Sequence, residues 1–226
     1  MKFKPLNYFE SVRVHRKKLP HWRQPGVTYF VTGRLADSVP QHVLDEWLKA
    51  KDQWLKERGI ESSDQLENAN EELRKEYHRM FTARFHELLD AGHGECVLRL
   101  PEIAGIVSGL FVKSHGTTCT LGAWVIMPNH FHALVTPLEG AALGVTTQKW
   151  KGSSSRQINL CLGRQGRLWQ AEGFDHVVRS EQQLNHFRRY IAENPVKAGL
   201  RDGWVLGIGA EVGMTVEQMK QRFELE

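Results

Sequence analysis

The stretch from Trp124 to Thr136 constrains the fold more than any other part of the chain. Its β-branched and aromatic content predicts two strands joined by a turn at Pro128. Side chains alternate between the faces of a strand, so His130 and His132 project from one face and Phe131 from the other. Two adjacent imidazoles can share a divalent metal, and each can equally satisfy a local hydrogen bond. The motif alone leaves both interpretations open.

Length and composition bound the remaining possibilities. A chain of 226 residues with 41% hydrophobic and 25% charged residues can bury one good core and still carry an appendage. No apolar run approaches the roughly 18 residues that span a bilayer, and the N-terminus lacks the apolar centre of a signal peptide. We therefore expect a soluble, cytoplasmic protein without a membrane partner. Cys96, Cys119 and Cys161 are odd in number and widely spaced, which predicts core thiols rather than disulfides or a zinc ribbon.

Positive charge is concentrated in two blocks. Residues 1–34 carry a net +7 and residues 148–201 a net +6, whereas residues 41–95 carry a net −5. Concentration of this kind favours a polyanion such as nucleic acid as the partner, although solvated basic surfaces are also common.

The basic blocks supply the candidate DNA contacts. The first block could lie along phosphates with Trp22 stacked on a base, or it could be a disordered leader whose tryptophan packs into the core. The hydroxyl-rich segment 144–162 could contact the sugar-phosphate backbone of a nucleic acid or be an ordinary polar helix surface. The candidates are Arg16, Lys17, Lys18, Trp22 and Arg23 in the first block, then Lys149, Lys151, Arg156, Arg188, Arg189 and Lys197 in the second.

Periodicity predicts the remaining elements. Residues 40–91 are acidic and have two apolar stripes of helical period, which indicates an inserted helical hairpin. Strands are expected at 26–33, 118–127, 131–136 and 174–178, and helices at 101–115, 144–162 and from 181 until Pro195 stops the last. The order predicts an α+β fold: a ferredoxin-like antiparallel sheet with helices on one face. We expect a basic arm at 1–25, a sheet domain at 26–201 with its insertion at about 40–91, and a tail at 202–226 that contains a short helix opened by Thr215.

Tyr190 and Asn194 form the second half of a candidate site. Residues four apart on a helix share one face, so the phenol and the amide can point to the same place. A tyrosine at such a position is more often a core residue. Its pairing with a ligand-capable amide and a basic surround favours a functional role.

Several segments together resemble a known family. His130-Phe-His132 resembles the histidine-hydrophobe-histidine motif of the HUH endonucleases, and the segment from Tyr190 to Gly199 resembles the nucleophile segment of the REP-associated tyrosine transposases. The resemblance covers most of residues 20–201, and Gly173 departs from it where family members often have an aromatic residue. Further matching segments are Trp124 to His130, Trp150-Lys-Gly152, Gly166-Arg-Leu-Trp-Gln170 and Phe174-Asp175.

The resemblance implies an enzyme that cuts and rejoins single-stranded DNA at hairpin-forming REP sequences. Residues 26–201 would be the HUH transposase domain. Tyr190 would be the nucleophile that forms a 5′-phosphotyrosine, and His130, His132 and Asn194 would hold Mg²⁺ or Mn²⁺. The protein would act as a monomer or a homodimer. Two alternatives stay open: a domesticated, non-catalytic binder of DNA hairpins, and a metal-dependent hydrolase of a small phosphoester.

Overall fold

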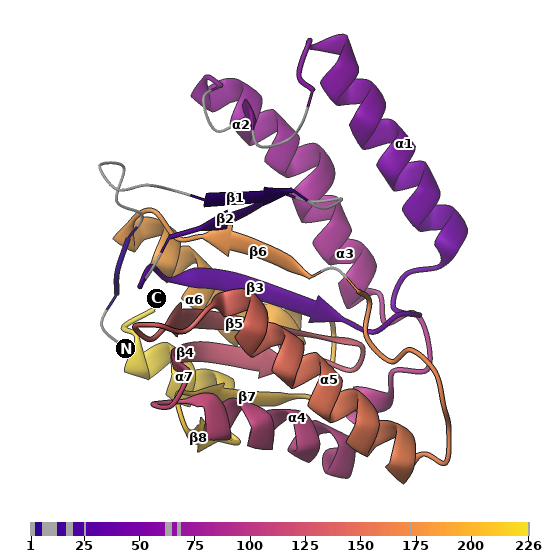
Figure 1. Ribbon diagram of the computed structural model, residues 1–226, viewed down its shortest axis with the longest axis vertical. Coiled ribbons are helices and arrows are strands. Elements are labelled where there is room, and N and C mark those ends of the chain that lie inside the picture. The colour runs from indigo at the N-terminus through magenta and orange to yellow at the C-terminus, as the bar shows by residue number, and fades with distance from the viewer. Residues whose placement is uncertain are drawn as a thin grey trace. The chain divides into compact units, whose positions relative to one another are not determined.

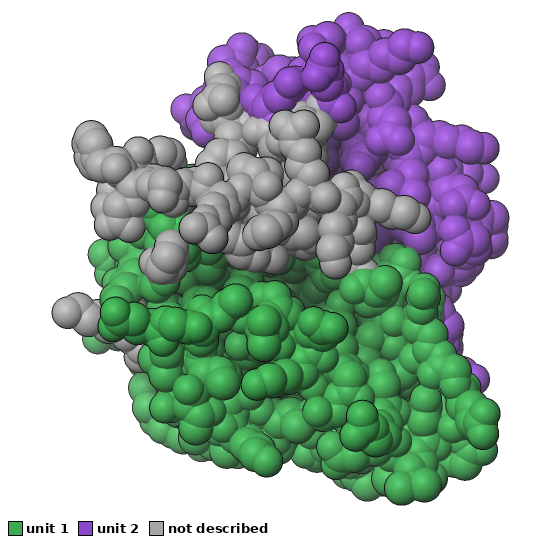
Figure 2. Space-filling view, in the orientation of Figure 1, with its two compact units in different colours: residues 1–36, 96–226 green, residues 37–95 purple. Residues whose placement is uncertain are grey.

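The structure is a computed structural model that describes residues 3–5, 13–16, 20–24, 26–61, 65–66, 69–171 and 173–225, and for 13–16 and 20–23 it describes the backbone alone. The chain divides into two compact units (Figure 2): residues 1–36 with 96–226, and residues 37–95. The second unit corresponds to the predicted insertion. Within the described ranges, no helix is long and apolar enough to cross a membrane.

The first unit is built on a six-stranded sheet in the order β6-β3-β5-β4-β7-β8 (Figure 1). Every neighbouring pair of strands is antiparallel. The central strands are rich in β-branched and aromatic residues, which suits a pleated, buried surface. The strands are β3 (Tyr29–Arg34), β4 (Cys119–Ile126), β5 (His130–Pro137), β6 (Phe174–Val177), β7 (Val205–Ile208) and β8 (Glu211–Val212).

The predicted ferredoxin-like fold is confirmed. In chain order β3, α4 (Pro101–Ser114), β4, β5, α5 (Leu143–Cys161) and β6 form two strand-helix-strand halves, with β3 and β5 central. Helices α4 and α5 bury Phe111, Trp150 and Ile158 against one face of the sheet. A short 3₁₀ turn (Val97–Arg99) leads into α4.

The expectation that helices cover only one face is wrong for the last two. Helices α6 (Glu181–Lys197) and α7 (Val216–Arg222) pack on the opposite face, where Leu184, Ile191 and Met219 share a core with Val125 and Leu134. The reason is that β4 has apolar side chains on both sides, Leu121 and Ile126 on one and Ala123 and Val125 on the other, so both faces of the sheet must be covered. Figure 1 shows α6 behind the sheet and α4 and α5 in front of it.

Residues 202–226, which the sequence predicts to be a separate tail, belong to the sheet domain. Strand β7 pairs with β4 and β8 extends the same edge. The predicted final helix follows as α7, where Thr215 and Gln218 form a reciprocal capping box.

Pro195 does not end α6, which continues to Lys197. Proline costs the helix one N–H donor, but here it lies in the final turn and the helix continues for two residues beyond it. The Ala198 N–H donates to the Asn194 carbonyl at 2.9 Å, and the Leu200 N–H donates to the Pro195 carbonyl at 2.9 Å. Tyr190 and Asn194 therefore stay one helical turn apart.

The second unit is helical, as its periodicity predicts. Helix α1 (Gln41–Glu57) forms the first arm, and α2 (Glu71–Tyr77), a π-helical turn (His78–Ala83) and α3 (Arg84–Asp90) form the second. Trp54, Leu55, Leu66 and Phe81 make its buried core.

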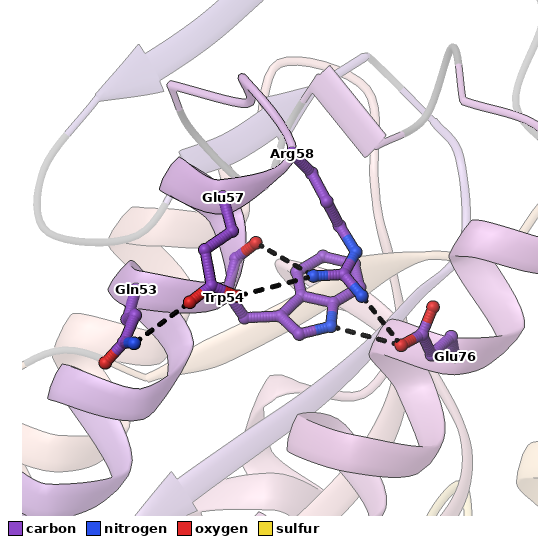
Figure 3. Close-up of polar contacts among 5 residues, drawn as sticks. All are labelled: Gln53, Trp54, Glu57, Arg58 and Glu76. Atoms are coloured by element: carbon purple, nitrogen blue, oxygen red, sulfur yellow. Dashed lines mark hydrogen bonds and ion pairs between the residues drawn. The ribbon is translucent and has the colours of Figure 1, made fainter.

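A polar cluster joins the two arms of this unit (Figure 3). The Arg58 guanidinium lies 4.0 Å from the centroid of the Trp54 ring and donates to Glu76 Oε1 at 3.0 Å. The Trp54 indole N–H donates to the same oxygen at 3.3 Å. One carboxylate thus satisfies the polar atoms of a buried aromatic side chain and of the cation above it, which fixes the register of the arms.

The N-terminal arm includes a two-stranded hairpin of β1 (Arg13–Arg16) and β2 (Pro20–Arg23). Lys17 and Lys18 and the side chains of Arg16, Trp22 and Arg23 lie outside the described part. Of the three cysteines, Cys96 and Cys119 are buried as expected, whereas Cys161 is exposed because it falls in the last turn of α5 on the solvent side.

Candidate active site

The two histidines lie at the start of β5, on the face of the sheet that α6 covers. His130 and His132 are fully buried, and Phe131 points to the opposite face, where it packs with Phe111 and Trp169. Gly33 leaves room for the Phe131 ring, because a Cβ there would lie 2.3 Å from it. The predicted placement of both imidazoles on one face is therefore what the sheet produces.

Each imidazole is held through its Nδ1 atom. His130 Nδ1 lies 2.7 Å from Asn129 Oδ1, and His132 Nδ1 lies 2.8 Å from Thr32 Oγ1. The two rings are 4.7 Å apart between centroids and inclined by 70°. With Nδ1 engaged in both rings, Nε2 is the nitrogen that each can offer to a ligand.

Helix α6 brings Tyr190 to this pair. The Tyr190 hydroxyl lies 3.3 Å from His132 Nε2, and the two rings meet edge to face with centroids 5.1 Å apart. Phe30 stacks on His132 and on Phe187 of α6, at centroid distances of 5.1 and 4.2 Å. This aromatic packing fixes the helix against the sheet, so the half-buried phenol is directed at the histidines.

Asn194 is fully buried one turn after Tyr190. In the described part of the chain, no three His, Cys, Asp or Glu side chains gather in a metal-binding arrangement. A cation at this place would therefore depend on two imidazoles and an uncharged oxygen such as that of Asn194. Nitrogen and amide oxygen are donor types that a divalent transition metal accepts, so the residues fit such an ion.

A buried cation lies beside the histidines. Arg34 pairs with His130 across β3 and β5, in the same way that Thr32 pairs with His132, and it is 7% exposed. Burial lowers the pKa of the Arg34 guanidinium. Arginine nevertheless stays protonated at neutral pH, so the site contains a fixed positive charge within a poorly solvated region.

The chain was compared with protein families, with curated proteins and with solved structures. No family model matches the chain. The chain is 31% identical over 85 residues to the REP-associated tyrosine transposase of Escherichia coli (strain K12), which is 38% of this chain and 47% of that protein. Over these residues the chain is similar to a REP-associated tyrosine transposase. The family resemblance predicted from the motifs is confirmed, although the match spans just under half the length of this relative.

A solved structure of the REP-associated tyrosine transposase bound to a REP hairpin is also similar, with a TM-score of 0.41 and 16% identity, over 79% of this chain and 74% of that one. Because the TM-score is low, the assignment of the fold rests on the strand order and helix placement of this chain.

The residues predicted to bind DNA are divided between the two faces of the sheet. Lys149 and Arg156 are exposed on α5, on the face opposite the histidines and Tyr190. The Lys151 ammonium donates to the Gln170 carbonyl at 3.0 Å, so it holds a loop of the protein itself. A single DNA surface that includes α5 and the tyrosine would have to pass around the edge of the sheet.

The predicted cations of α6 have different surroundings. Arg189 is exposed, whereas Arg188 lies 4.5 Å from the centroid of the Phe223 ring and donates to Asn185 at 2.8 Å. Lys197 forms an ion pair with Glu193 at 3.0 Å. Arg189 is therefore the member of this group best placed for an external phosphate, and the DNA role of all of them stays a prediction.

The structure adds residues to the site that the motifs did not indicate. Thr32, Arg34 and Phe30 come from β3, about a hundred positions before the histidines in the chain. Their alternation along a predicted strand places them on one face, but no local pattern pairs that strand with β5. Asn129 falls in the turn predicted at Pro128, and its position directly before His130 is the one local signal for this contact.

Gly173 is explained by the packing at the same strand. A Cβ at Gly173 would lie 2.9 Å from the Thr32 carbonyl oxygen and 3.3 Å from Lys151 Nζ. The aromatic residue expected here from the resemblance has no room in this chain.

Proposed function

We propose that this chain is a metal-dependent, single-stranded DNA transposase that cleaves and rejoins hairpin-forming, REP-like DNA through a 5′-phosphotyrosine intermediate. The observation that carries the proposal is the placement of the Tyr190 hydroxyl 3.3 Å from His132 within a buried pair of histidines. The relationship to the REP-associated tyrosine transposases supports both the reaction and the type of DNA.

Tyr190 is suited to reversible strand transfer. Its oxygen would attack the phosphorus, the bond from phosphorus to the 3′ oxygen would break, and the departing oxygen would take up a proton as the phenol loses one. The new phosphotyrosine ester conserves the energy of the broken bond, so rejoining requires no ATP. A phenol with a pKa of about 10 is also an acceptable leaving group for the reverse step.

The surrounding residues supply positive charge and cation ligands. His130, His132 and Asn194 would hold a divalent ion such as Mn²⁺ or Mg²⁺, which polarises the scissile phosphate when bound. Arg34 adds a permanent charge beside His130, where a phosphate oxygen can be stabilised with little screening by water. The same Nε2 atom of His132 cannot accept the phenol's hydrogen bond and ligate a cation at once. Tyr190 therefore has to leave this hydrogen bond when the cation is bound.

The monomeric or homodimeric state expected from the resemblance stays a prediction. Since the histidines have no exposed surface, a phosphate can enter only after a local movement of the half-buried Tyr190 side chain or of α6. The cytoplasmic location expected from the sequence stays a prediction.

The test uses labelled single-stranded DNA with a REP-like hairpin, incubated with Mn²⁺ or Mg²⁺ and resolved by denaturing electrophoresis. We expect the wild type to form a slow-migrating covalent adduct that EDTA, Tyr190→Phe and His130→Ala each abolish. Tyr77→Phe is a matched control, because it removes a half-buried tyrosine hydroxyl in the helical unit and should leave the adduct unchanged.

The alternatives predict different outcomes. A protein that binds the hairpin but forms no adduct or nick with any metal is a binder without turnover. Equal cleavage by wild type and Tyr190→Phe would show that water is the nucleophile and would refute the transposase proposal. Hydrolysis of small phosphoesters with no response to DNA would identify a phosphoesterase.

A further inference from the structure

We propose that Thr32 and Asn129 are positioning residues that fix the tautomer and the ring orientation of His132 and His130, so that both Nε2 atoms present lone pairs toward α6. The inference rests on the proposed metal site and identifies the residues that orient its histidine ligands. Each residue acts through a single hydrogen bond to an Nδ1 atom, at 2.8 Å for Thr32 and 2.7 Å for Asn129.

Asn129 determines the tautomer of His130. An amide oxygen can only accept a hydrogen bond, so the facing Nδ1 atom must be the protonated nitrogen of a neutral imidazole. Nε2 of His130 then has the lone pair that a cation needs. Asn129 is itself well anchored, because it is 1% exposed and its carbonyl accepts the Leu35 N–H at 2.8 Å.

Thr32 does the same for His132 from another strand. A hydroxyl can donate or accept, so this contact alone does not settle the tautomer. The Tyr190 hydroxyl on the other side of the ring can likewise donate or accept, and the tautomer inferred for His132 is the one in which the phenol donates to Nε2. If the phenol donates to Nε2 at 3.3 Å, then Nδ1 must be protonated and must donate to Thr32 Oγ1. In this tautomer Nε2 accepts from the Tyr190 hydroxyl and Nδ1 donates to Thr32 Oγ1.

Backbone geometry makes Thr32 a rigid anchor. It is 3% exposed, and its Cα lies directly opposite that of His132 in the β3–β5 register. A β-branched side chain on a strand has few χ1 rotamers, so the hydroxyl has a fixed position. Side chains directly opposite on antiparallel strands are near enough for such a contact.

Thr28 provides a matched control. It lies on the same face of the sheet, immediately before β3, and its buried hydroxyl forms a 2.8 Å hydrogen bond with the Thr136 hydroxyl. Thr28→Val removes the same kind of buried hydrogen bond as Thr32→Val, together with a 3.4 Å hydrogen bond from the Lys4 N–H, and both substitutions keep the β-branched shape. Only Thr32 contacts a histidine.

The experiment compares wild type, Thr32→Val, Thr32→Ser, Asn129→Ala, Asn129→Asp and Thr28→Val. The metal-free proteins are examined by ¹⁵N NMR of the imidazoles, which reports the tautomer, and Mn²⁺ affinity is measured by titration calorimetry. Loss of an outer partner of a metal-binding histidine typically lowers affinity by roughly 10–100-fold. We expect that loss, with mixed tautomers, for Thr32→Val and Asn129→Ala. Thr32→Ser, Asn129→Asp and Thr28→Val should keep the wild-type tautomers and bind Mn²⁺ within about threefold of wild type or more tightly.

Two results would overturn the inference. Wild-type tautomers and Mn²⁺ affinity in Thr32→Val and Asn129→Ala would show that these partners do not position the rings. A loss of Mn²⁺ affinity in Thr28→Val as large as in Thr32→Val would show that destabilisation of the fold, and not the contact with His132, lowers the affinity. If the wild type itself binds no Mn²⁺, the proposed metal site fails, whereas the tautomers of the metal-free variants still decide whether the two residues hold the rings.

Discussion

Replacing Glu193 by Gln should loosen the attachment of the C-terminal helix to the helix that carries Tyr190. Glu193 of α6 forms ion pairs with Lys220 of α7 at 2.9 Å and with Lys197 of its own helix at 3.0 Å. The substitution keeps the size of the side chain and removes its charge, so it tests the ion pairs alone.

The size of the expected loss of stability follows from the exposure of the two lysines that pair with Glu193. The Lys197 side chain is 57% exposed, and an exposed pair four residues apart on a helix contributes only about 0.3–0.5 kcal/mol. Lys220 is 34% exposed and Glu193 20%, so the contact between helices should contribute about 0.5–1 kcal/mol. Together the two ion pairs predict that Glu193→Gln lowers the free energy of unfolding by about 1 kcal/mol, which corresponds to roughly 2–4 °C in Tm for a chain of this size.

The pH dependence has a definite sign. Burial alone would raise the pKa of Glu193, but the hydrogen bonds and charges of Lys220 and Lys197 lower it overall. A carboxyl group whose pKa is lower in the folded state stabilises the protein above the unfolded value, about 4.3 for Glu, and loses that contribution as pH falls through the folded value. The difference between wild type and Glu193→Gln should therefore be complete at pH 7 and disappear in acid.

The assay is thermal unfolding at low salt and in 1 M NaCl, at pH 7 and pH 3. At 1 M the screening length is about 3 Å, so the difference should shrink strongly. Lys220→Met should cost more than Lys197→Met, because its ion pair is less exposed. A difference between wild type and Glu193→Gln that survives both high salt and pH 3 would show that packing, not charge, is responsible, and would refute the reasoning.

Three further predictions concern the site and its surroundings. Arg34→Gln should lower the rate of adduct formation by roughly 10² in a single-turnover assay, and Arg34→Lys by less, if the guanidinium stabilises the phosphate; equal rates would exclude that role. Gly173→Ala should lower stability by about 1–3 kcal/mol in denaturant titrations, because its Cβ would lie 2.9 Å from the Thr32 carbonyl oxygen. Cys161 should react first with a thiol reagent near pH 8, since it is exposed, whereas burial raises the pKa of Cys119 to about 11; rapid labelling of Cys119 in the folded protein would contradict this.

The sequence alone determined most of the elements and which residues share a face of each. Alternation along one strand placed His130 and His132 together, and helical spacing did the same for Tyr190 and Asn194. Local patterns of this kind are readable because they depend only on the geometry of a single element. The helix starts at Ser180 and Thr215 were predictable for the same reason, since a cap is a contact between near neighbours in the chain.

Only the tertiary structure decided which elements face one another. It placed α6 on the histidine face and α5 on the other, which brings Tyr190 to His132 and takes Lys149 and Arg156 away from them. It also paired Thr32 with His132, 100 positions apart in the chain. The physical reason is that strand order and the coverage of each face depend on long-range pairing and on burying both faces of β4 and β5. No periodicity within a single segment contains that information.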